Sequence, residues 1–232
     1  MLITRMRHVI ASLVAVIAGF APTMAAQGRL VDQATLVITR GSVMIGKEQF
    51  VLRSGRQSAP GSGFTLTVRA HYPANRPDPV LVSIFEFGPD SQPATGRLDL
   101  DTGERPSVLI SVTPRRITVR RVTPGAESAR QYPAVERALL TDEFLVSLHA
   151  VLPSRREGTI TTIDPRTGRT EIVELVDLGA GSTLVGDAQI TLRHLTLGSG
   201  NQMRHLWYDA EGRLMKVEVT HGSLTATRSP GS

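Results

Sequence analysis

Alternation of apolar and polar residues with a period of two recurs along most of the chain, and it constrains the fold more than any other feature. Such alternation lines the two faces of a β-strand with different side chains. Gly, Pro, Asp and Asn interrupt it at short intervals, as turns require. The pattern predicts a mostly antiparallel β protein with strands near 34–39, 47–52, 64–72, 80–87, 97–101, 108–113, 116–123, 159–163, 170–176, 188–197, 202–209 and 214–220.

A single helical pattern interrupts the strands. Thr141 is placed to cap an α-helix, Asp142 and Glu143 put negative charge in its first turn, and Pro153 ends it. A further helical turn is expected over 133–140. A sheet of about ten to twelve strands tends to curl. The expected fold is therefore a strongly curved antiparallel sheet or unclosed β-barrel with one or two helices on its concave face. The apolar residues with helical spacing are Phe144, Leu145, Leu148, Val151 and Leu152.

The first 26 residues have the layout of a cleavable secretory signal. Arg5 and Arg7 precede a mostly apolar stretch from Val9 to Phe20, and the small residues Ala25 and Ala26 follow. The stretch is too short for a membrane span. We therefore expect residues 1–26 to be removed and residues 27–232 to form a single β-rich domain in the periplasm or outside the cell, peripheral to a membrane at most.

Composition excludes several classes of protein. The sequence contains no cysteine, so no disulfide holds the fold. The formal charge of +5 becomes +3 without Arg5 and Arg7, and Arg exceeds Lys strongly, which is typical of a GC-rich genome. Aromatic residues are too few to serve as stacking platforms between basic ones, so nucleic acid is not an expected partner.

Motifs of catalysis are weak. Asp101, Thr102 and Gly103 match the triplet of pepsin-like proteases, but those enzymes need two such carboxylates. The same pattern, an Asp followed within a few residues by Gly and then a charged residue, recurs in "DPRTGR" (164–169) and "DAEGR" (209–213), which favours hairpin turns. There is no G-x-S-x-G motif. The histidines at 71, 149, 194, 205 and 221 lack metal-ligand spacing, so no cofactor, metal or catalytic residue is expected.

The strongest charge feature is "TPRRITVRRVTP" (113–124). On a strand, its arginines flank a short apolar centre, which leaves two interpretations open. The first is a patch for phosphate groups or an acidic partner. The second, which we favour, is a solvated edge strand whose charges prevent aggregation. The arginines are Arg115, Arg116, Arg120 and Arg121.

The stretch "HLWYDAEGRLMKVEV" (205–219) predicts a β-hairpin. A three-residue loop would make Asp209 oppose Arg213, and the pairs Trp207–Met215 and His205–Val217 would follow on one apolar face. This register predicts that Trp207 is a core anchor. His205 on that face is more simply a core histidine than a ligand, although its role stays open.

Together, the signal-like start, the first hairpin "ATLVITRGSVMIGKEQFVL" (34–52), the mid-chain helix and this closing hairpin resemble uncharacterised secreted bacterial β proteins of unknown function. Their end reads roughly W-x-D-x-x-G-R-L-x-x-V. The resemblance implies a fold similar to that of lipoprotein carriers, a curved sheet around a helix, and it carries over no catalytic residues. The matching residues are Trp207, Asp209, Gly212, Arg213, Leu214 and Val217.

The leading hypothesis is non-enzymatic binding of an apolar or lipid-like ligand on the concave face of the sheet, in the bacterial envelope. The alternatives are a structural or interaction protein of the envelope with no small ligand and, with less support, a hydrolase assembled from distant residues. The expected ligand-binding residues are Phe144, Leu145, Leu148, Trp207 and Met215.

Overall fold

The computed structural model describes residues 28–55, 63–101, 106–142, 144–198 and 200–231. The expected signal sequence, and the Thr-Gly of the Asp-Thr-Gly triplet, lie outside the described residues. Within the described ranges, no helix is long and apolar enough to cross a membrane.

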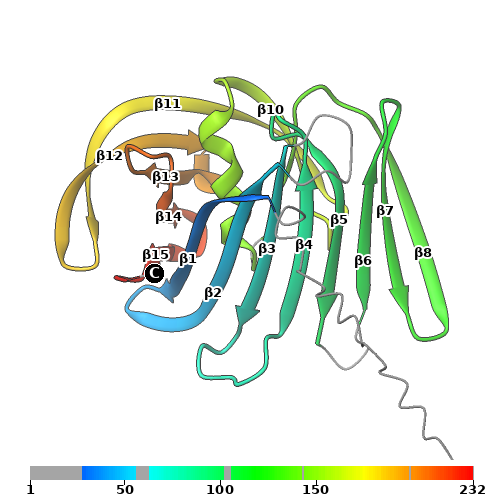
Figure 1. Ribbon diagram of the computed structural model, residues 1–232, viewed down its shortest axis with the longest axis horizontal. Helices are drawn as coiled ribbons and strands as arrows, with labels where there is room; N and C mark the ends of the chain where they lie inside the picture. Colours follow the sequence, from blue (N-terminus) through cyan, green and yellow to red (C-terminus); the bar gives the residue numbers. More distant parts are fainter. Residues whose placement is uncertain (1–27, 56–62, 102–105, 143, 199, 232) are drawn as a thin grey trace, which may run out of the picture.

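One sheet dominates the molecule (Figure 1). Its described part has fifteen strands in the order β8-β7-β6-β5-β4-β3-β2-β1-β15-β14-β13-β12-β11-β10-β9. The strands are β1 Arg29–Arg40, β2 Val43–Ser54, β3 Phe64–His71, β4 Leu81–Phe87, β5 Pro93–Leu100, β6 Ser107–Val112, β7 Arg116–Thr123, β8 Ala126–Pro133, β9 Ala138–Leu140, β10 Gly158–Ile163, β11 Thr170–Val185, β12 Ala188–Leu197, β13 Arg204–Tyr208, β14 Leu214–Val219 and β15 Leu224–Arg228.

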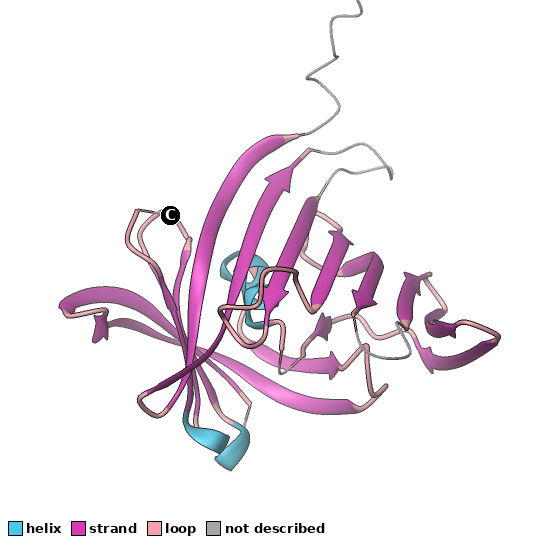
Figure 2. Cartoon of the chain, turned by 90° about the horizontal axis from the view of Figure 1, so that it is seen from below, coloured by secondary structure: helices cyan, strands magenta, loops and turns pink. Residues whose placement is uncertain are grey.

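Neighbouring strands are antiparallel except β9 and β10, which run parallel. The sheet is strongly curved (Figure 2) but does not close, because β8 and β9 stand at its two ends. Side chains of β8 reach the turn between β10 and β11, where Tyr132 donates to the carbonyl of Gly168 at 2.5 Å and Arg130 to that of Thr167 at 2.8 Å. The predicted fold class, an unclosed β-barrel with a helix on its concave face, is confirmed.

The helix on the concave face is η2, a 3-10 helix over Val146–Ser154 (Figure 1). It packs against β2, β3 and β14. All residues from Val146 to Leu152 are buried, including the polar Ser147 and His149, so the helix is covered on every side. It is also bonded to β13, because the Tyr208 hydroxyl donates to the carbonyl of His149 at 2.8 Å. Two one-turn 3-10 helices, η3 Gly200–Gln202 and η4 His221–Ser223, lie in the turns after β12 and β14.

The helix differs from the prediction in three respects. It is a 3-10 helix that begins at Val146, and Thr141 does not cap it. Asp142 instead accepts a bond from its neighbour Phe144 N and binds Arg166, so its charge is used outside the helix. The helical turn expected over 133–140 is wrong, because Ala138–Leu140 forms strand β9.

The arginine-rich segment forms β7 but not an edge strand. Its neighbour β8, which the alternation did not predict, covers it and forms the edge of the sheet. Arg116 bonds Gln131 and Arg120 forms an ion pair with Glu127, both across the β7–β8 hairpin. Ile117 and Val119 between them are buried in the core. The expectation of a bare edge is therefore wrong, and two of the four arginines serve to hold β8.

The register expected for the β13–β14 hairpin is also wrong beyond its turn. Tyr208 pairs with Leu214 as expected, but Met215 forms a β-bulge and Trp207 then pairs with Lys216, not Met215. The shift by one residue places Leu206 opposite Val217 on the concave face. Trp207 is buried at 7% exposure, yet it lies on the opposite face from its core neighbours.

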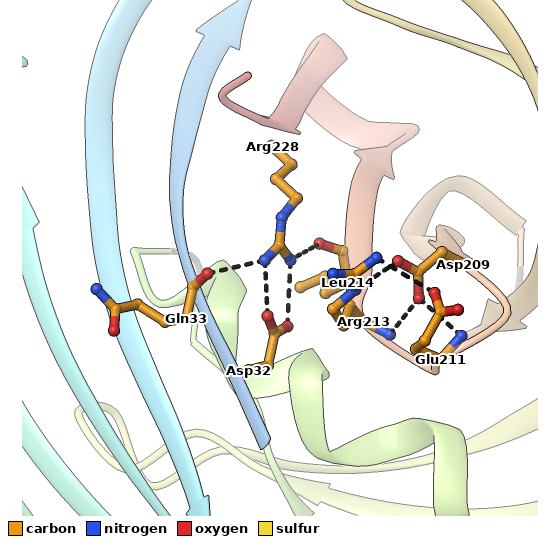
Figure 3. Close-up of polar contacts among 7 residues, drawn as sticks. All are labelled: Asp32, Gln33, Asp209, Glu211, Arg213, Leu214 and Arg228. Atoms are coloured by element: carbon orange, nitrogen blue, oxygen red, sulfur yellow. Dashed lines mark hydrogen bonds and ion pairs between the residues drawn. The ribbon is translucent and has the colours of Figure 1, made fainter. Parts of the chain in front are cut away.

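The turn of this hairpin is as expected, and a buried ion pair lies beside it (Figure 3). Asp209 accepts the amide of Arg213 at 2.8 Å and binds its guanidinium at 2.7 Å, while Gly212 has a φ of +77°. Arg228 at the end of β15 donates to Asp32 on β1 at 2.7 and 3.2 Å and to the carbonyls of Gln33 and Leu214. The ion pair joins β1 to β15, the centre of the sheet.

Candidate ligand-binding cavity

A cavity of about 360 Å³ lies at one end of η2, between the helix and the ends of β1, β2, β13, β14 and β15. This volume falls within the range of small-molecule sites. One wall is apolar and consists of Ile45, Phe144, Val146, Val217, Val219 and Leu224. The principal polar lining residues are Arg40, Tyr72, Asp142, His149, Arg204 and His221.

Exposure within the lining shows which side meets solvent. Val146, His149 and Val217 are buried, whereas Arg40, Gln202 and His221 are exposed. The cavity therefore has a buried inner end, in which His149 and Asp142 lie among apolar residues, and a polar mouth. We name it the arginine-rimmed cavity, after Arg40 and Arg204.

Glu48 of β2 holds the start of η2 beside this cavity. Its buried carboxylate accepts the amides of Val146 and Ser147 at 2.9 Å each, which caps the helix from another strand. The Tyr72 hydroxyl donates to the same carboxylate at 3.1 Å. Burial raises the pKa of Glu48 to about 7, and the backbone bonds partly oppose this effect. The wall formed by Val146 and Tyr72 therefore depends on one buried acid.

A second polar group fixes the aromatic part of the wall. Asp142 binds Arg166 through both of its oxygens, and the Arg166 guanidinium lies 4.7 Å from the centre of the Phe144 ring. Phe144 in turn meets Tyr72 edge to face, with 5.3 Å between ring centres. Desolvation raises the pKa of Asp142, while Arg166 acts in the opposite direction. Because Asp142 is paired, the acidic group in the lining is largely neutralised.

His149 is the buried histidine of the lining. Its Nδ1 lies 2.8 Å from the carbonyl of Val146, and a carbonyl accepts, so Nδ1 carries the proton. Burial and the nearby positive charge of Arg204 lower the pKa of His149 to about 3, which keeps the ring neutral. Its Nε2 atom is buried and has no hydrogen-bond partner within the described part of the chain. A neutral, fixed imidazole adds polarity to the wall without adding charge.

The structure brings some of the predicted ligand-binding residues together and separates others. Phe144 lines the cavity, and Leu145 and Leu148 are fully buried in the adjacent core. Trp207 lies on the other face of the sheet, and Met215 lies at the bulge of β14 outside the cavity lining. The five residues therefore do not form one surface, although their binding role remains a prediction.

Sequence reasoning missed the rim of the cavity. Arg40, Arg204 and His221 come from three turns that the topology places side by side. Arg40 ends β1, Arg204 begins β13 and His221 begins η4 just after β14, but many residues of a β protein occupy such positions. The signal that was available is the buried acid in a strand, because Glu48 interrupts the apolar positions of "GKEQFVL" (46–52).

The outer face carries a separate group of aromatic rings. His194 stacks on Trp207 with 3.8 Å between ring centres and 8° between planes, and its Nε2 lies 3.0 Å from Nδ1 of His205. This places His205 outside the main core, contrary to expectation, because the bulge at Met215 shifts the pairing. Across the described ranges, no three His, Asp or Glu side chains gather closely enough to hold a metal ion.

The fold is that of a β-barrel-like protein whose sheet stays open. No protein-family model matches the sequence, and no curated protein matches it either. Among solved structures, the chain is similar to a β-barrel-like protein of a domain of unknown function, DUF1849, from Brucella abortus. The TM-score is 0.49 and the identity 9%, over 88% of this chain and 98% of that chain.

Proposed function

We propose that this protein is a non-enzymatic binding protein for a small lipid-like molecule that has an apolar part and an anionic group. The single observation that carries the proposal is the arginine-rimmed cavity. Its lining includes an apolar group, Val146, Val217 and Val219, and two cations, Arg40 and Arg204. An acyl chain fits the former and a carboxylate or phosphate the latter.

The charge balance of the cavity supports an anion. The acid in the lining, Asp142, is bound to Arg166 at 2.8 Å, which offsets its negative charge, and Arg40 and Arg204 add positive charge to the lining. His149 is neutral because its pKa is lowered to about 3. An amphipathic anion therefore finds an apolar surface and two cations in one place.

The proposal includes export to the cell envelope, which rests on the signal-like layout of residues 1–26. The lipoprotein-carrier resemblance of the sequence is compatible with the same role. The described residues show no convergence of a nucleophile and a base in the cavity lining, and Tyr72 there is committed to Glu48. Binding therefore explains the geometry better than hydrolysis.

The test uses the mature protein purified from its own cell envelope. Native mass spectrometry is expected to show a bound small molecule, and a dansyl-labelled fatty acid is expected to bind the delipidated protein in solution. Val219→Trp, which fills the cavity, should reduce this binding at least about tenfold. Val82→Trp, at a surface position of β4, is the matched control and should bind as the wild type does.

Each outcome decides the proposal. Loss of binding in Val219→Trp alone, with both variants folded by circular dichroism, supports it. If the wild-type protein carries no small molecule and does not bind the fatty acid, the proposal is overturned. A structural protein of the envelope then becomes the better interpretation. Equal binding by Val219→Trp and the wild type places any ligand elsewhere and also overturns it.

A further inference from the structure

Beside the mouth of the cavity, the β1–β2 turn presents two apolar side chains to solvent. Val43 is 63% exposed and Met44 50% exposed, and they follow the two turn residues Gly41 and Ser42. Phe144, 39% exposed, lies in the lining of the cavity to which Arg40 of the same hairpin also belongs. Adjacent exposed apolar residues at a turn tip do nothing for the core, so they point to a role outside it.

The tip is held firmly against the cavity. Gly41 has a φ of +57°, which suits a tight two-residue hairpin turn, and its amide donates to the carbonyl of Ser223 in η4 at 3.0 Å. Arg40 pairs directly with Val43, so both side chains lie on the cavity side, while Met44 pairs with Thr39 and lies on the outer side. Apolar side chains therefore stand on both faces of one anchored tip.

The charges near the tip are basic. Arg40 is part of the tip hairpin and of the cavity rim. Lys47 stands four residues beyond Val43 on β2. The acid in the lining, Asp142, is bound to Arg166. Apolar residues on the same hairpin as Arg40 and Lys47 match the boundary of an anionic bilayer, in which acyl chains lie under negative headgroups.

We propose that the β1–β2 tip, Arg40 to Met44, docks this protein on an anionic lipid membrane, with Val43 and Met44 inserted among the headgroups and Arg40 bound to lipid phosphate. This inference rests on the proposed function, because docking there would bring the mouth of the arginine-rimmed cavity to the surface that holds its ligand. The ligand would then pass between bilayer and cavity with little exposure of its apolar part to water.

The experiment measures co-sedimentation of the mature protein with vesicles. Vesicles of phosphatidylethanolamine and phosphatidylglycerol are expected to bind it, and vesicles of phosphatidylcholine to bind it much more weakly. The double variant Val43→Asp/Met44→Asp should lose binding at least about tenfold, since a charge opposes insertion. Arg40→Ala should lose about fivefold.

The matched control carries the same chemistry elsewhere. Val82→Asp/Ile84→Asp changes two residues of β4 that are each 36% exposed and lie on one face, outside the cavity lining. It should bind anionic vesicles as the wild type does. Three results would each overturn the docking inference. They are equal vesicle binding by the tip variant and the wild type, an equal loss of vesicle binding in the control, and no preference of the wild type for anionic vesicles.

A parallel assay separates this inference from the proposed function. Binding of the dansyl-labelled fatty acid in solution without vesicles should be the same for the tip double variant and the wild type. Normal fatty-acid binding together with no vesicle binding overturns docking alone, and a protein partner captured through the tip would then be the better explanation. Vesicle binding through the tip without fatty-acid binding overturns the cavity proposal alone.

Discussion

Replacement of Glu48 by glutamine tests how a buried acid controls the wall of the cavity. The carboxylate is fully buried, and burial raises its pKa from 4.5 to about 7. The folded state therefore favours the protonated acid more strongly than the unfolded state does. A raised pKa means that this stabilisation is fully present below pH 4.5 and is lost as the pH rises through about 7.

The magnitude follows from the two pKa values. The difference between 4.5 and about 7 corresponds to about 3 kcal/mol of unfolding free energy. The amide side chain of the Glu48→Gln variant would keep an oxygen that accepts from Tyr72 or from one amide of η2, but it does not titrate. The unfolding free energy of the wild type minus that of Glu48→Gln should therefore fall by about 3 kcal/mol from pH 4.5 to about pH 8.

Urea unfolding followed by the fluorescence of Trp207, the one tryptophan of the sequence, measures this difference at each pH. Other titrating groups, His149 among them, occur in both proteins and cancel. Glu136→Gln, which changes an exposed carboxylate, is the control and should show a difference close to constant. A wild-type minus Glu48→Gln difference that stays constant or rises with pH would refute the reasoning.

Three further predictions concern single contacts. Arg228→Met leaves the carboxylate of Asp32 buried and unpaired, so the unfolding free energy measured in urea should fall by about 3–5 kcal/mol. Adding Asp32→Leu should recover much of this loss. An Arg228→Met protein as stable as the wild type would contradict the prediction. The pKa of His149 is lowered to about 3, so its neutral form stabilises the fold above pH 6.5 and this stabilisation is lost as the pH falls. The wild type should therefore lose about 3 kcal/mol more unfolding free energy than His149→Phe between pH 6.5 and pH 4, measured by urea unfolding. An equal loss in the two proteins would contradict the lowered pKa. A Cβ on Gly181 would lie 3.0 Å from the Trp207 ring, so Gly181→Leu should cost about 1–3 kcal/mol and shift the fluorescence emission of Trp207, and an unchanged spectrum would count against the stacking geometry.

The sequence predicted most strands because their alternation reflects one buried and one exposed face. It missed β8, whose residues alternate little because almost all are exposed, β9, whose three residues are all buried, and β15, in which only Ala226 is fully buried. It placed a helix correctly near Leu148, but the expected start and cap of that helix were wrong. The helix is buried on every side, so it has no polar face to mark its limits, and its cap comes from Glu48 on a distant strand.

The candidate site was less predictable than the fold. Phe144 was identified because it belongs to a local apolar pattern, and it does line the cavity. Arg40 and Arg204 become neighbours only through the strand order, which alternation does not specify. Trp207 changed faces because the bulge at Met215 shifts the pairing by one residue. A single irregularity of the backbone therefore moved Trp207 and His205 off the face of the sheet on which they were expected.

The pairing of β1 with β15 has a consequence for the order of folding. Thr39 and Thr225, which are bonded across this seam, lie 186 positions apart, and the ion pair of Asp32 and Arg228 spans 196. Hairpins on either side form from local contacts, but the two halves of the sheet join only when this long loop closes. Until then the Leu36–Arg40 edge of β1 is open to other chains. In pulse-labelled hydrogen exchange, the amides of β1 and β15 that are bonded across this seam should therefore gain protection last, after those of β15 that face β14.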